Sequence, residues 1–368
     1  MKYYIIAGEA SGDLHGSNLI KELKQLDNQS NIRCWGGDLM QAAGGQVVKH
    51  YRDLAFMGFA EVIKNLPAIL RNFKFCKQDI SEFQPDVLIL IDYPGFNLRM
   101  AKWAKTQNIK VVYYISPQVW AWKENRVKTI KACVDKMLVI LPFEKAFYQK
   151  WNYDVVYVGH PLVAVVDDYM VQQKTAVPEW EGKPFIALLP GSRKQEILKK
   201  LPVMLSVCPQ FPAYHFVIAK APGIENSFYD TLITAHPNVS TVSNKTYALL
   251  SHAQAALVTS GTATLETALF GVPEIICYKG NPISYQIAKR LINIRFIGLV
   301  NLIMDKEVVK ELIQDELNTT QLTKELKLML EDENRKAQIQ KDYAALKSLL
   351  SIGGNASRKA AASIVEML

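Results

Sequence analysis

The chain is poor in the residues that build metal centres and disulfide frameworks. Its 368 residues include 5 cysteines and 6 histidines, and no two cysteines form a CxxC pair. An odd, scattered set of cysteines disfavours both a structural zinc site and a disulfide framework, and it fits a reducing cytoplasm. The histidines form no ligand cluster and no convincing DxD motif is present, so we expect no metal and no other cofactor.

Long apolar runs and secretion signals are missing as well. No apolar stretch approaches the ~20 residues that a helix needs to span a bilayer. The first residues run directly into an apolar strand pattern, without the basic and apolar segments of a signal peptide. We therefore expect a cytoplasmic protein that is soluble or bound to a membrane surface, and not an integral membrane protein.

Several common site patterns are also absent. Residues 8–13 (GEASGD) lack both the GxGxxG spacing of a dinucleotide fingerprint and the Lys-Ser/Thr of a P-loop. No nucleophile elbow is present, which disfavours Ser-His-Asp chemistry. The net charge of +8 favours anionic ligands such as phosphates or an acidic membrane surface. Because no basic stripe or RNA-binding signature accompanies that charge, we expect no nucleic-acid partner.

What is present is one α/β pattern that occurs twice. An apolar strand, a glycine-containing turn and an amphipathic helix begin at residue 3 and again at residue 185. We predict two Rossmann-like, doubly wound domains over 1–165 and 166–355, because 368 residues exceed one usual core. A last helix at 356–368 is expected to pack back on the first domain. Two such domains would face a central cleft walled by helix N-termini, which suits an anionic ligand such as a nucleotide.

Short apolar runs predict buried parallel strands, and helical periodicity predicts the helices between them. The predicted strands cover 3–7, 86–91, 111–115, 137–140, 155–158, 185–189, 214–219, 255–259 and 274–278. The predicted helices cover 14–26, 97–107, 126–132, 143–151, 194–206, 263–270, 283–291, 306–313, 319–331 and 333–349.

Asp92 is the candidate catalytic residue of the first domain. It directly follows the apolar run 87–91, so its carboxylate is expected at the carboxyl edge of the sheet, where ligands of α/β proteins bind. A partly buried carboxylate there can have a raised pKa and act as a general base toward a hydroxyl. Alternatively, Asp92 only ends the strand or caps the helix that follows Pro94.

Residues 8–13 follow the first strand in the same way, and they either bind a ligand or serve turn and capping chemistry alone. Glu9 stands at the end of the strand. Ser11 or Asp13 is expected to cap a helix that begins near Leu14.

The second domain carries a phosphate-binding pattern. Arg193 follows Gly191 and Ser192 directly after a strand, and a guanidinium beside free backbone N–H groups suits a diphosphate. Small residues at 259–264 leave backbone donors uncovered between a strand and a helix. Glu266 lies one turn into that helix, where it either accepts hydrogen bonds from ribose hydroxyls or is a surface carboxylate.

Residues 56–75 form a basic amphipathic segment that suits either an anionic bilayer and acyl chains or a protein core. Its apolar face is expected to hold Phe59, Val62, Ile63, Leu66, Leu70 and Phe73. Its basic residues are Lys64, Arg71 and Lys74, with Lys77 close behind.

These segments together resemble the lipid-A-disaccharide synthases, a family of inverting glycosyltransferases with the two-domain GT-B architecture. The resemblance covers essentially the whole chain. It rests on the order and spacing of residues 8–13, 54–58, 61–62, 91–97, 116–122, 141–148, 188–193, 260–266 and 301–302. Two positions depart from the family pattern, because Gly95 stands where a second acidic residue is common and Val300 where proline is common.

The resemblance implies a reaction and a set of site residues. A 2,3-diacylglucosamine unit passes from UDP-2,3-diacylglucosamine to 2,3-diacylglucosamine 1-phosphate, which gives lipid A disaccharide 1-phosphate and UDP without a metal. Asp92 is implied as the base for the acceptor 6-hydroxyl. In the same acceptor domain, Glu9 is implied as a second catalytic residue and Ser11 as a substrate-binding residue. The residues implied on the UDP-sugar side are Arg193, Ser260, Gly261, Thr262, Glu266 and Asn301.

The resemblance also implies a peripheral position on the cytoplasmic face of the inner membrane. Because the substrates are diacylated, docking is expected through Phe59, Ile63, Leu66 and Leu70. An oligomer is compatible with the sequence.

Two other functions remain open from the sequence alone. The first is another enzyme of the same architecture, such as a UDP-sugar 2-epimerase or a different UDP-N-acetylglucosamine transferase. Such an enzyme would not discriminate between acylated and unacylated donors. The second is a non-catalytic module that binds nucleotide or phospholipid, in which case Asp92→Asn would leave every activity intact.

Overall fold

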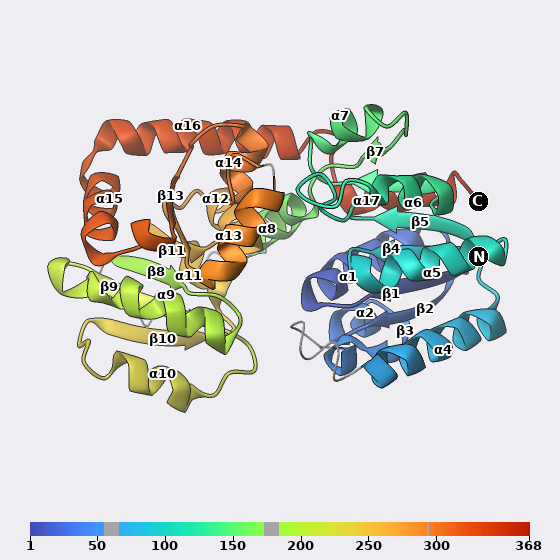
Figure 1. The fold of residues 1–368 in the computed structure, drawn as a ribbon, viewed down its shortest axis with the longest axis horizontal. Helices are drawn as coiled ribbons and strands as arrows, with labels where there is room; N and C mark the ends of the chain where they lie inside the picture. Colours follow the sequence, from blue (N-terminus) through green and yellow to red (C-terminus); the bar gives the residue numbers. More distant parts are fainter. Residues whose placement is uncertain (55–65, 173–183, 293) are drawn as a thin grey trace. The chain divides into compact units, whose positions relative to one another are not determined.

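The computed structural model describes residues 1–54, 66–172, 184–292 and 294–368, apart from the side chains of Leu66 and of several residues in one helix. The chain forms two compact units (Figure 1). The first unit comprises Met1–Pro161 and Leu350–Leu368, and the second comprises Leu162–Leu349. Each unit contains one all-parallel sheet, so the predicted doubly wound α/β class is confirmed.

The first unit is wound around a seven-stranded sheet in the order β3-β2-β1-β4-β5-β6-β7. Its strands are β1 (Lys2–Ala7), β2 (Asn31–Gly36), β3 (Gln46–His50), β4 (Val87–Ile91), β5 (Lys110–Tyr114), β6 (Lys136–Val139) and β7 (Val156–Tyr157). Its helices are α1 (Ala10–Leu26), α2 (Asp38–Ala42), α4 (Leu66–Phe83), α5 (Pro94–Thr106), α6 (Arg126–Cys133), α7 (Glu144–Gln149) and α17 (Ala356–Val365), with a 3-10 turn η1 (Tyr51–Leu54).

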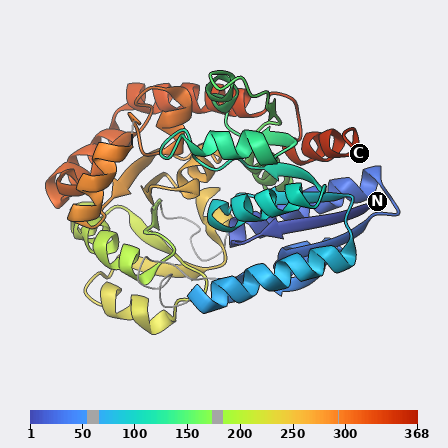
Figure 2. The same cartoon turned by 45° about the vertical axis from the view of Figure 1, so that its right-hand side comes forward.

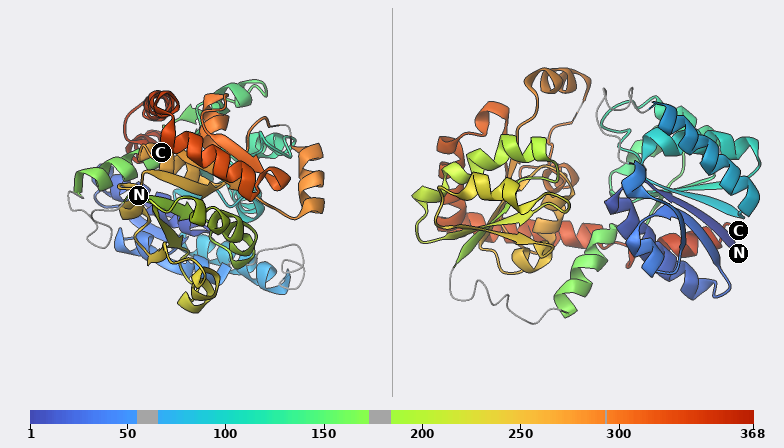
Figure 3. Two further views of the ribbon diagram at one scale, coloured as in Figure 1. Left: turned by 90° about the vertical axis from the view of Figure 1, so that its left-hand side faces the viewer. Right: turned by 90° about the horizontal axis from the view of Figure 1, so that it is seen from below.

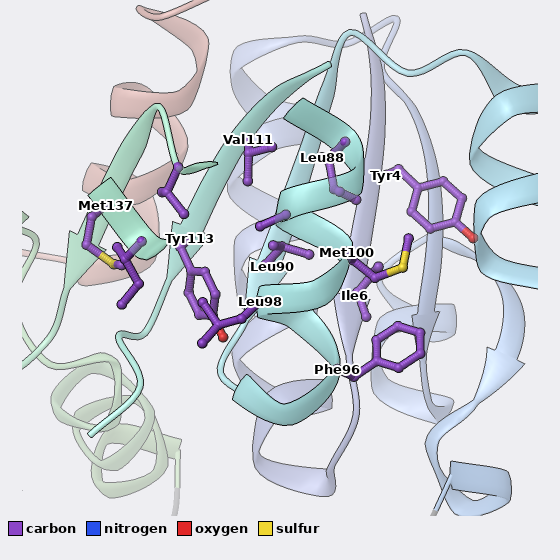
Figure 4. Close-up of a cluster of buried hydrophobic side chains, with 14 of the residues drawn as sticks. Tyr4, Ile6, Leu88, Leu90, Phe96, Leu98, Met100, Val111, Tyr113 and Met137 are labelled. Atoms are coloured by element: carbon purple, nitrogen blue, oxygen red, sulfur yellow. The ribbon is translucent and has the colours of Figure 1, made fainter. Parts of the chain in front are cut away.

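Burial on both faces explains why the central strands are continuously apolar. All five residues of β4 are buried. Helices α4 and α5 run along one face of the sheet (Figure 2), and α1 covers the other (right panel of Figure 3). On the α5 face, Leu88 and Leu90 of β4 pack with Met100 of α5 and Tyr113 of β5 (Figure 4).

The C-terminal helix belongs to the first unit, where α17 packs against α1. Its Ala360 and Ala361 are fully buried. Just before this helix, the carbonyl of Leu350 accepts a hydrogen bond from the backbone N–H of His160 at 3.0 Å. The end of the chain therefore returns to the unit in which the chain begins.

The second unit repeats the winding with a six-stranded sheet in the order β10-β9-β8-β11-β12-β13. Its strands are β8 (Phe185–Leu189), β9 (His215–Lys220), β10 (Val239–Ser243), β11 (Ala255–Thr259), β12 (Glu274–Tyr278) and β13 (Lys310–Ile313). Its helices are α8 (Pro161–Gln172), α9 (Lys194–Ser206), α10 (Asn226–Ile233), α11 (Thr246–Leu250), α12 (Thr262–Leu269), α13 (Pro282–Leu291), α14 (Leu299–Met304), α15 (Thr319–Glu331) and α16 (Glu333–Leu350). Two 3-10 turns are η3 (Cys208–Gln210) and η4 (Gln314–Glu316).

The predicted elements differ from the structure mainly away from the sheet centres. The strands β2, β3 and β10 were not predicted, because β3 and β10 are only partly buried and β2 contains Arg33. The helix predicted over 306–313 is wrong, since Lys310–Ile313 form β13. That segment has helical spacing, but it pairs in parallel with β12, and this tertiary contact overrides the local pattern.

Asp13 caps α2, and not the helix in which it lies. Helix α1 begins at Ala10 and has no side-chain cap, so the predicted cap near Leu14 is wrong. The buried carboxylate of Asp13 accepts three backbone N–H groups at the start of α2. The donors are Gly37 at 2.7 Å, Met40 at 3.0 Å and Leu39 at 3.1 Å.

We expect Asp13→Ala to lower the free energy of unfolding by about 2–3 kcal/mol, because it leaves buried N–H groups without an acceptor. Asp38→Ala, at an exposed position in the first turn of α2, is the control and should cost about 0.5 kcal/mol. Urea denaturation of both variants gives the comparison. Equal losses would show that the Asp13 carboxylate is not the cap that orders α2.

Candidate active site and nucleotide pocket

Glu9 and Asp92 lie at the carboxyl edge of the first unit's sheet. Glu9 follows β1 and Asp92 follows β4. Because β1 and β4 pair in parallel with Ala7 opposite Ile91, the two acidic residues leave neighbouring strands at the same level. The strand order reverses between β1 and β4, which is the point where open α/β sheets bind their ligands.

The backbone that carries the Asp92 carboxylate is a strained left-handed turn. The φ angles of Asp92 and Tyr93 are 43° and 47°, and neither residue is glycine. The carbonyl of Asp92 accepts hydrogen bonds from the hydroxyl of Tyr113 at 2.6 Å and from Nδ2 of Asn97 at 2.8 Å. The buried Asn97 amide also donates to the carbonyl of Ile91 at 3.1 Å. These contacts hold the turn in its strained conformation.

Gly8 leaves room for the ring of Tyr93. A Cβ atom at Gly8 would lie 2.5 Å from that ring, so a side chain there would displace it. The Tyr93 ring stacks on Phe96 at 5.7 Å between centroids, and Phe96 stacks on Phe73 of α4 at 4.3 Å. The loop after β1 and the loop after β4 are therefore packed against each other through an aromatic contact.

The environment of Asp92 raises the pKa of its carboxyl group. Burial raises the pKa of its half-buried carboxyl to about 6, and the negative charge of Glu9 adds to the rise. A hydrogen bond to backbone at Tyr93 opposes that rise. At pH 7 the carboxylate is mostly ionised, and because its pKa lies near this pH it can accept a proton readily.

The other residues of the first loop have separate positions. Ser11 is exposed in the first turn of α1, directly after Glu9 and Ala10. The carboxylate of Asp13 accepts hydrogen bonds from the start of α2. Burial lowers the pKa of His15 to about 4, so this ring is neutral at pH 7. The structure thus brings Glu9, Ser11 and Asp92 to the same edge of the sheet.

The second unit has a cavity of about 360 Å³ at the carboxyl ends of β8, β9 and β11. It lies where the strand order of this sheet reverses, between β8 and β11. The N-termini of α9 and α12 border it. Among its lining residues are Gly191, Ser192, Ser260, Gly261, Thr262 and Glu266.

The N-terminus of α12 presents backbone donors to this cavity. Gly261 precedes the helix with φ of 152°, a conformation that side chains rarely adopt. The first N–H groups of a helix have no partner within it, so they can bind an anion. The hydroxyl of Ser260 donates to the carbonyl of Ile297 at 2.9 Å, which anchors the loop that leads into α12.

Glu266 lines the cavity and is held by a tyrosine. The hydroxyl of Tyr247 donates to Oε1 of Glu266 at 2.8 Å. Burial raises the pKa of Glu266, and this hydrogen bond opposes the rise. The second carboxyl oxygen can accept a hydrogen bond from a ligand hydroxyl. Tyr247 was not predicted, because it lies in a separate short helix, α11.

Arg193 stands beside the cavity in an ion pair. Its Nη1 lies 3.3 Å from Oε1 of Glu196, and its side chain is 57% exposed. Glu196 lines the cavity, whereas Arg193 is not among the lining residues. Glu196 was not predicted as a site residue. Its position three residues after Arg193, in the first turn of α9, is the sequence feature that could have indicated this ion pair.

Asn301, like Arg193, is a predicted site residue that is not among the lining residues of the cavity. It is fully buried. Its Oδ1 accepts the N–H groups of Val308 and Val309, and its Nδ2 donates to the carbonyl of Val309 and to Glu311. All four hydrogen-bonding positions of this amide are occupied, so its contacts are with the protein.

Within the described ranges, no group of three or more His, Cys, Asp or Glu side chains is arranged to hold a metal ion.

The structure describes the side chain of only one of the four predicted docking residues. Phe59 and Ile63 lie outside the described residues, and so does the side chain of Leu66. Leu70 is described and is 58% exposed.

Solved structures share this architecture at low sequence identity. The UDP-GlcNAc 2-epimerase of Neisseria meningitidis bound to UDP-GlcNAc matches with a TM-score of 0.71 at 13% identity, over 100% of both chains. The calicheamicin glycosyltransferase CalG4 matches with a TM-score of 0.61 at 16% identity, over 99% of this chain and 97% of that one. The protein therefore has the fold of GT-B glycosyltransferases and UDP-GlcNAc 2-epimerases.

Sequence comparison distinguishes between a glycosyltransferase and a UDP-GlcNAc 2-epimerase. The profile of the LpxB lipid-A-disaccharide synthetase family matches residues 3–366. The lipid-A-disaccharide synthase of Geobacter sulfurreducens is 38% identical, over 99% of this chain and 96% of that one. The enzyme of Syntrophus aciditrophicus is 40% identical, over 97% and 95%. The chain belongs to the lipid-A-disaccharide synthase family, and it is a glycosyltransferase of lipid A biosynthesis, which confirms the resemblance.

We expect Tyr113→Phe to lower kcat about 10-fold with little change in the KM of the donor, because it frees the turn that orients Asp92. Tyr153→Phe is the matched control, since it also removes a hydroxyl bonded to a backbone carbonyl, that of Val134, but elsewhere in the first unit. Steady-state kinetics would contradict this role if both variants lost the same activity.

Proposed function

We propose that the first unit supplies the general base and that the second unit binds the UDP-sugar. In this reaction the 6-hydroxyl of 2,3-diacylglucosamine 1-phosphate attacks the anomeric carbon of UDP-2,3-diacylglucosamine. Asp92 takes the hydroxyl proton while the bond from that carbon to the UDP oxygen breaks. The position of the half-buried Asp92 at the switch point of the sheet, beside the loop that carries Glu9, is the observation that carries this proposal, and its raised pKa supports it.

The cavity of the second unit suits the departing UDP. The N-terminus of α12, preceded by Gly261, would stabilise the growing charge on the diphosphate. Thr262 stands at the start of the same helix. Glu266 would accept hydrogen bonds from the ribose hydroxyls through the oxygen that Tyr247 does not bind. The exposed Arg193 would exchange its partner Glu196 for the diphosphate.

In the first unit, Glu9 would act on catalysis through Asp92. Its negative charge raises the pKa of the base and thereby strengthens it. Ser11 has an exposed hydroxyl in the turn that follows Glu9, where it would bind the acceptor.

We expect Asp92→Asn to lower kcat by about 10²-fold or more while UDP affinity stays within about 2-fold. In the wild type, kcat/KM should fall below about pH 6, because a protonated Asp92 in the free enzyme cannot accept the hydroxyl proton. Kinetics across pH and calorimetric titration with UDP measure both effects.

Glu9→Gln provides the control for the pH dependence. Removing the negative charge lowers the pKa of Asp92, so the acidic limb of the kcat/KM profile should move to lower pH. An unchanged activity of Asp92→Asn would contradict the proposed base and would show that another group accepts the hydroxyl proton.

We also propose that residues 56–75 dock on the cytoplasmic face of the inner membrane. The described part of this segment, in α4, has Leu70 58% exposed and Phe75 42% exposed. Arg71 and Lys74 are exposed beside them, so apolar and cationic side chains occur together. None of the helices in the described parts of the chain is long and apolar enough to cross a bilayer.

Replacing Phe59, Ile63 and Leu66 with serine should reduce sedimentation with anionic phospholipid vesicles about 10-fold or more, because it removes apolar area that inserts into the headgroup region. Leu198→Ser is the control, since Leu198 of α9 is an apolar residue exposed to 51% in the second unit. Sedimentation that is unchanged in the triple variant would place the docking surface elsewhere.

A further inference from the structure

Glu311 is a buried carboxylate of the second unit that does not line the cavity. It lies in β13, and its two oxygens accept three hydrogen bonds. Oε1 accepts the N–H of Gly298 at 3.0 Å and Nδ2 of Asn301 at 2.9 Å, and Oε2 accepts the N–H of Ile297 at 3.0 Å. A carboxylate with this many N–H donors fixes the backbone that supplies them.

The residue held by Glu311 also holds a lining residue of the cavity. The carbonyl of Ile297 accepts the hydroxyl of Ser260 at 2.9 Å. Ile297 is thus bound on its N–H by Glu311 and on its carbonyl by Ser260. Ser260 lines the cavity and precedes Gly261, which is the N-cap residue of α12.

The loop at 297–298 can reach Glu311 only because it lies directly on the sheet. A Cβ atom at Gly298 would collide with the side chain of Ile276, and it would lie 3.2 Å from Oε1 of Glu311. Ile276 and Glu311 are neighbours across the pairing of β12 and β13. Asn301 adds a second connection, because it joins α14 to the backbone of Val308 and Val309 before β13.

One other acidic group faces this network. Glu274 of β12 is buried, and its burial together with the charge of Glu311 raises its pKa well above the usual value.

We propose that Glu311 is a positioning residue for nucleotide binding, which acts through Ile297 on Ser260 and the N-terminus of α12. The inference rests on the proposed binding of UDP in this cavity. It deepens that proposal, because it assigns the shape of the diphosphate site to a carboxylate that does not touch the ligand. Asn301 takes part in the same network.

The test is calorimetric titration of Glu311→Gln with UDP. The glutamine keeps the side-chain shape, but its NH₂ group would face an N–H donor and release the loop. We expect the Kd for UDP and the KM of the UDP-sugar to rise about 10-fold or more, whereas kcat at saturating donor changes less than about 3-fold. Glu307→Gln, at an exposed ion pair with Lys310, is the matched control and should change neither.

A double-mutant cycle separates positioning from a general loss of stability. If Glu311 acts through Ile297, Ser260→Ala weakens UDP binding in the wild type, but it adds little to Glu311→Gln because the loop is already released. Additive effects, or a Glu311→Gln variant that binds UDP like the wild type, would overturn the inference. If Glu311→Gln does not fold, Glu311→Asp replaces it in the same cycle, since the shorter carboxylate cannot reach all three donors.

The same titration distinguishes this inference from the proposed function. Wild-type protein that does not bind UDP would remove the cavity assignment itself. Wild-type binding that survives in Glu311→Gln would remove only the role of Glu311.

Discussion

The hydrogen bonds to the carbonyl of Asp92 are the constraint on which the first unit's site depends. Two consecutive non-glycine residues in the left-handed region are unfavourable, and such a turn persists only where its surroundings determine it. Tyr113 supplies one donor from β5, and Asn97 supplies another from α5. Because both donors are rooted in the core, the carboxylate is presented by the rigid part of the fold.

The two units use the same winding for different electrostatic tasks. In the first, the switch point holds an acidic side chain whose ionised form is disfavoured by burial and by a neighbouring acid. In the second, the switch point holds uncovered backbone donors at the start of α12, with Glu266 a turn further along. Under the proposed function, the first unit would accept a proton and the second would accommodate negative charge, which are the two tasks of an inverting sugar transfer.

Much of this organisation could be predicted from the sequence, because it follows from local patterns. Apolar runs located the central strands, and the residue after each run located Glu9, Asp92 and the cavity loops. The partners of those residues could not be found in the same way. Tyr113 and Asn97 look like core residues, and Glu311 looks like a helical surface residue in a segment that forms β13.

The hydrogen-bond partners of Asn301 could not be predicted from the sequence either. The family resemblance marked it as a site residue, but a motif does not reveal which partner its side chain chooses. Only the fold shows that its amide is saturated by Val308, Val309 and Glu311. Contacts between segments distant in the sequence decide such roles, and they depend on the register of β12 and β13.

The raised pKa of Asp92 has a thermodynamic consequence for the folded protein. A carboxyl whose folded pKa is about 6 binds its proton more tightly than the unfolded chain does. Its contribution to stability is therefore complete only in acid, below the unfolded pKa, and is lost as the pH rises through 6. Above that pH the enzyme retains an ion that opposes folding by at most about 3 kcal/mol. Stability alone would not favour this side chain, and under the proposed function its cost to folding accompanies a carboxylate that is able to accept a proton.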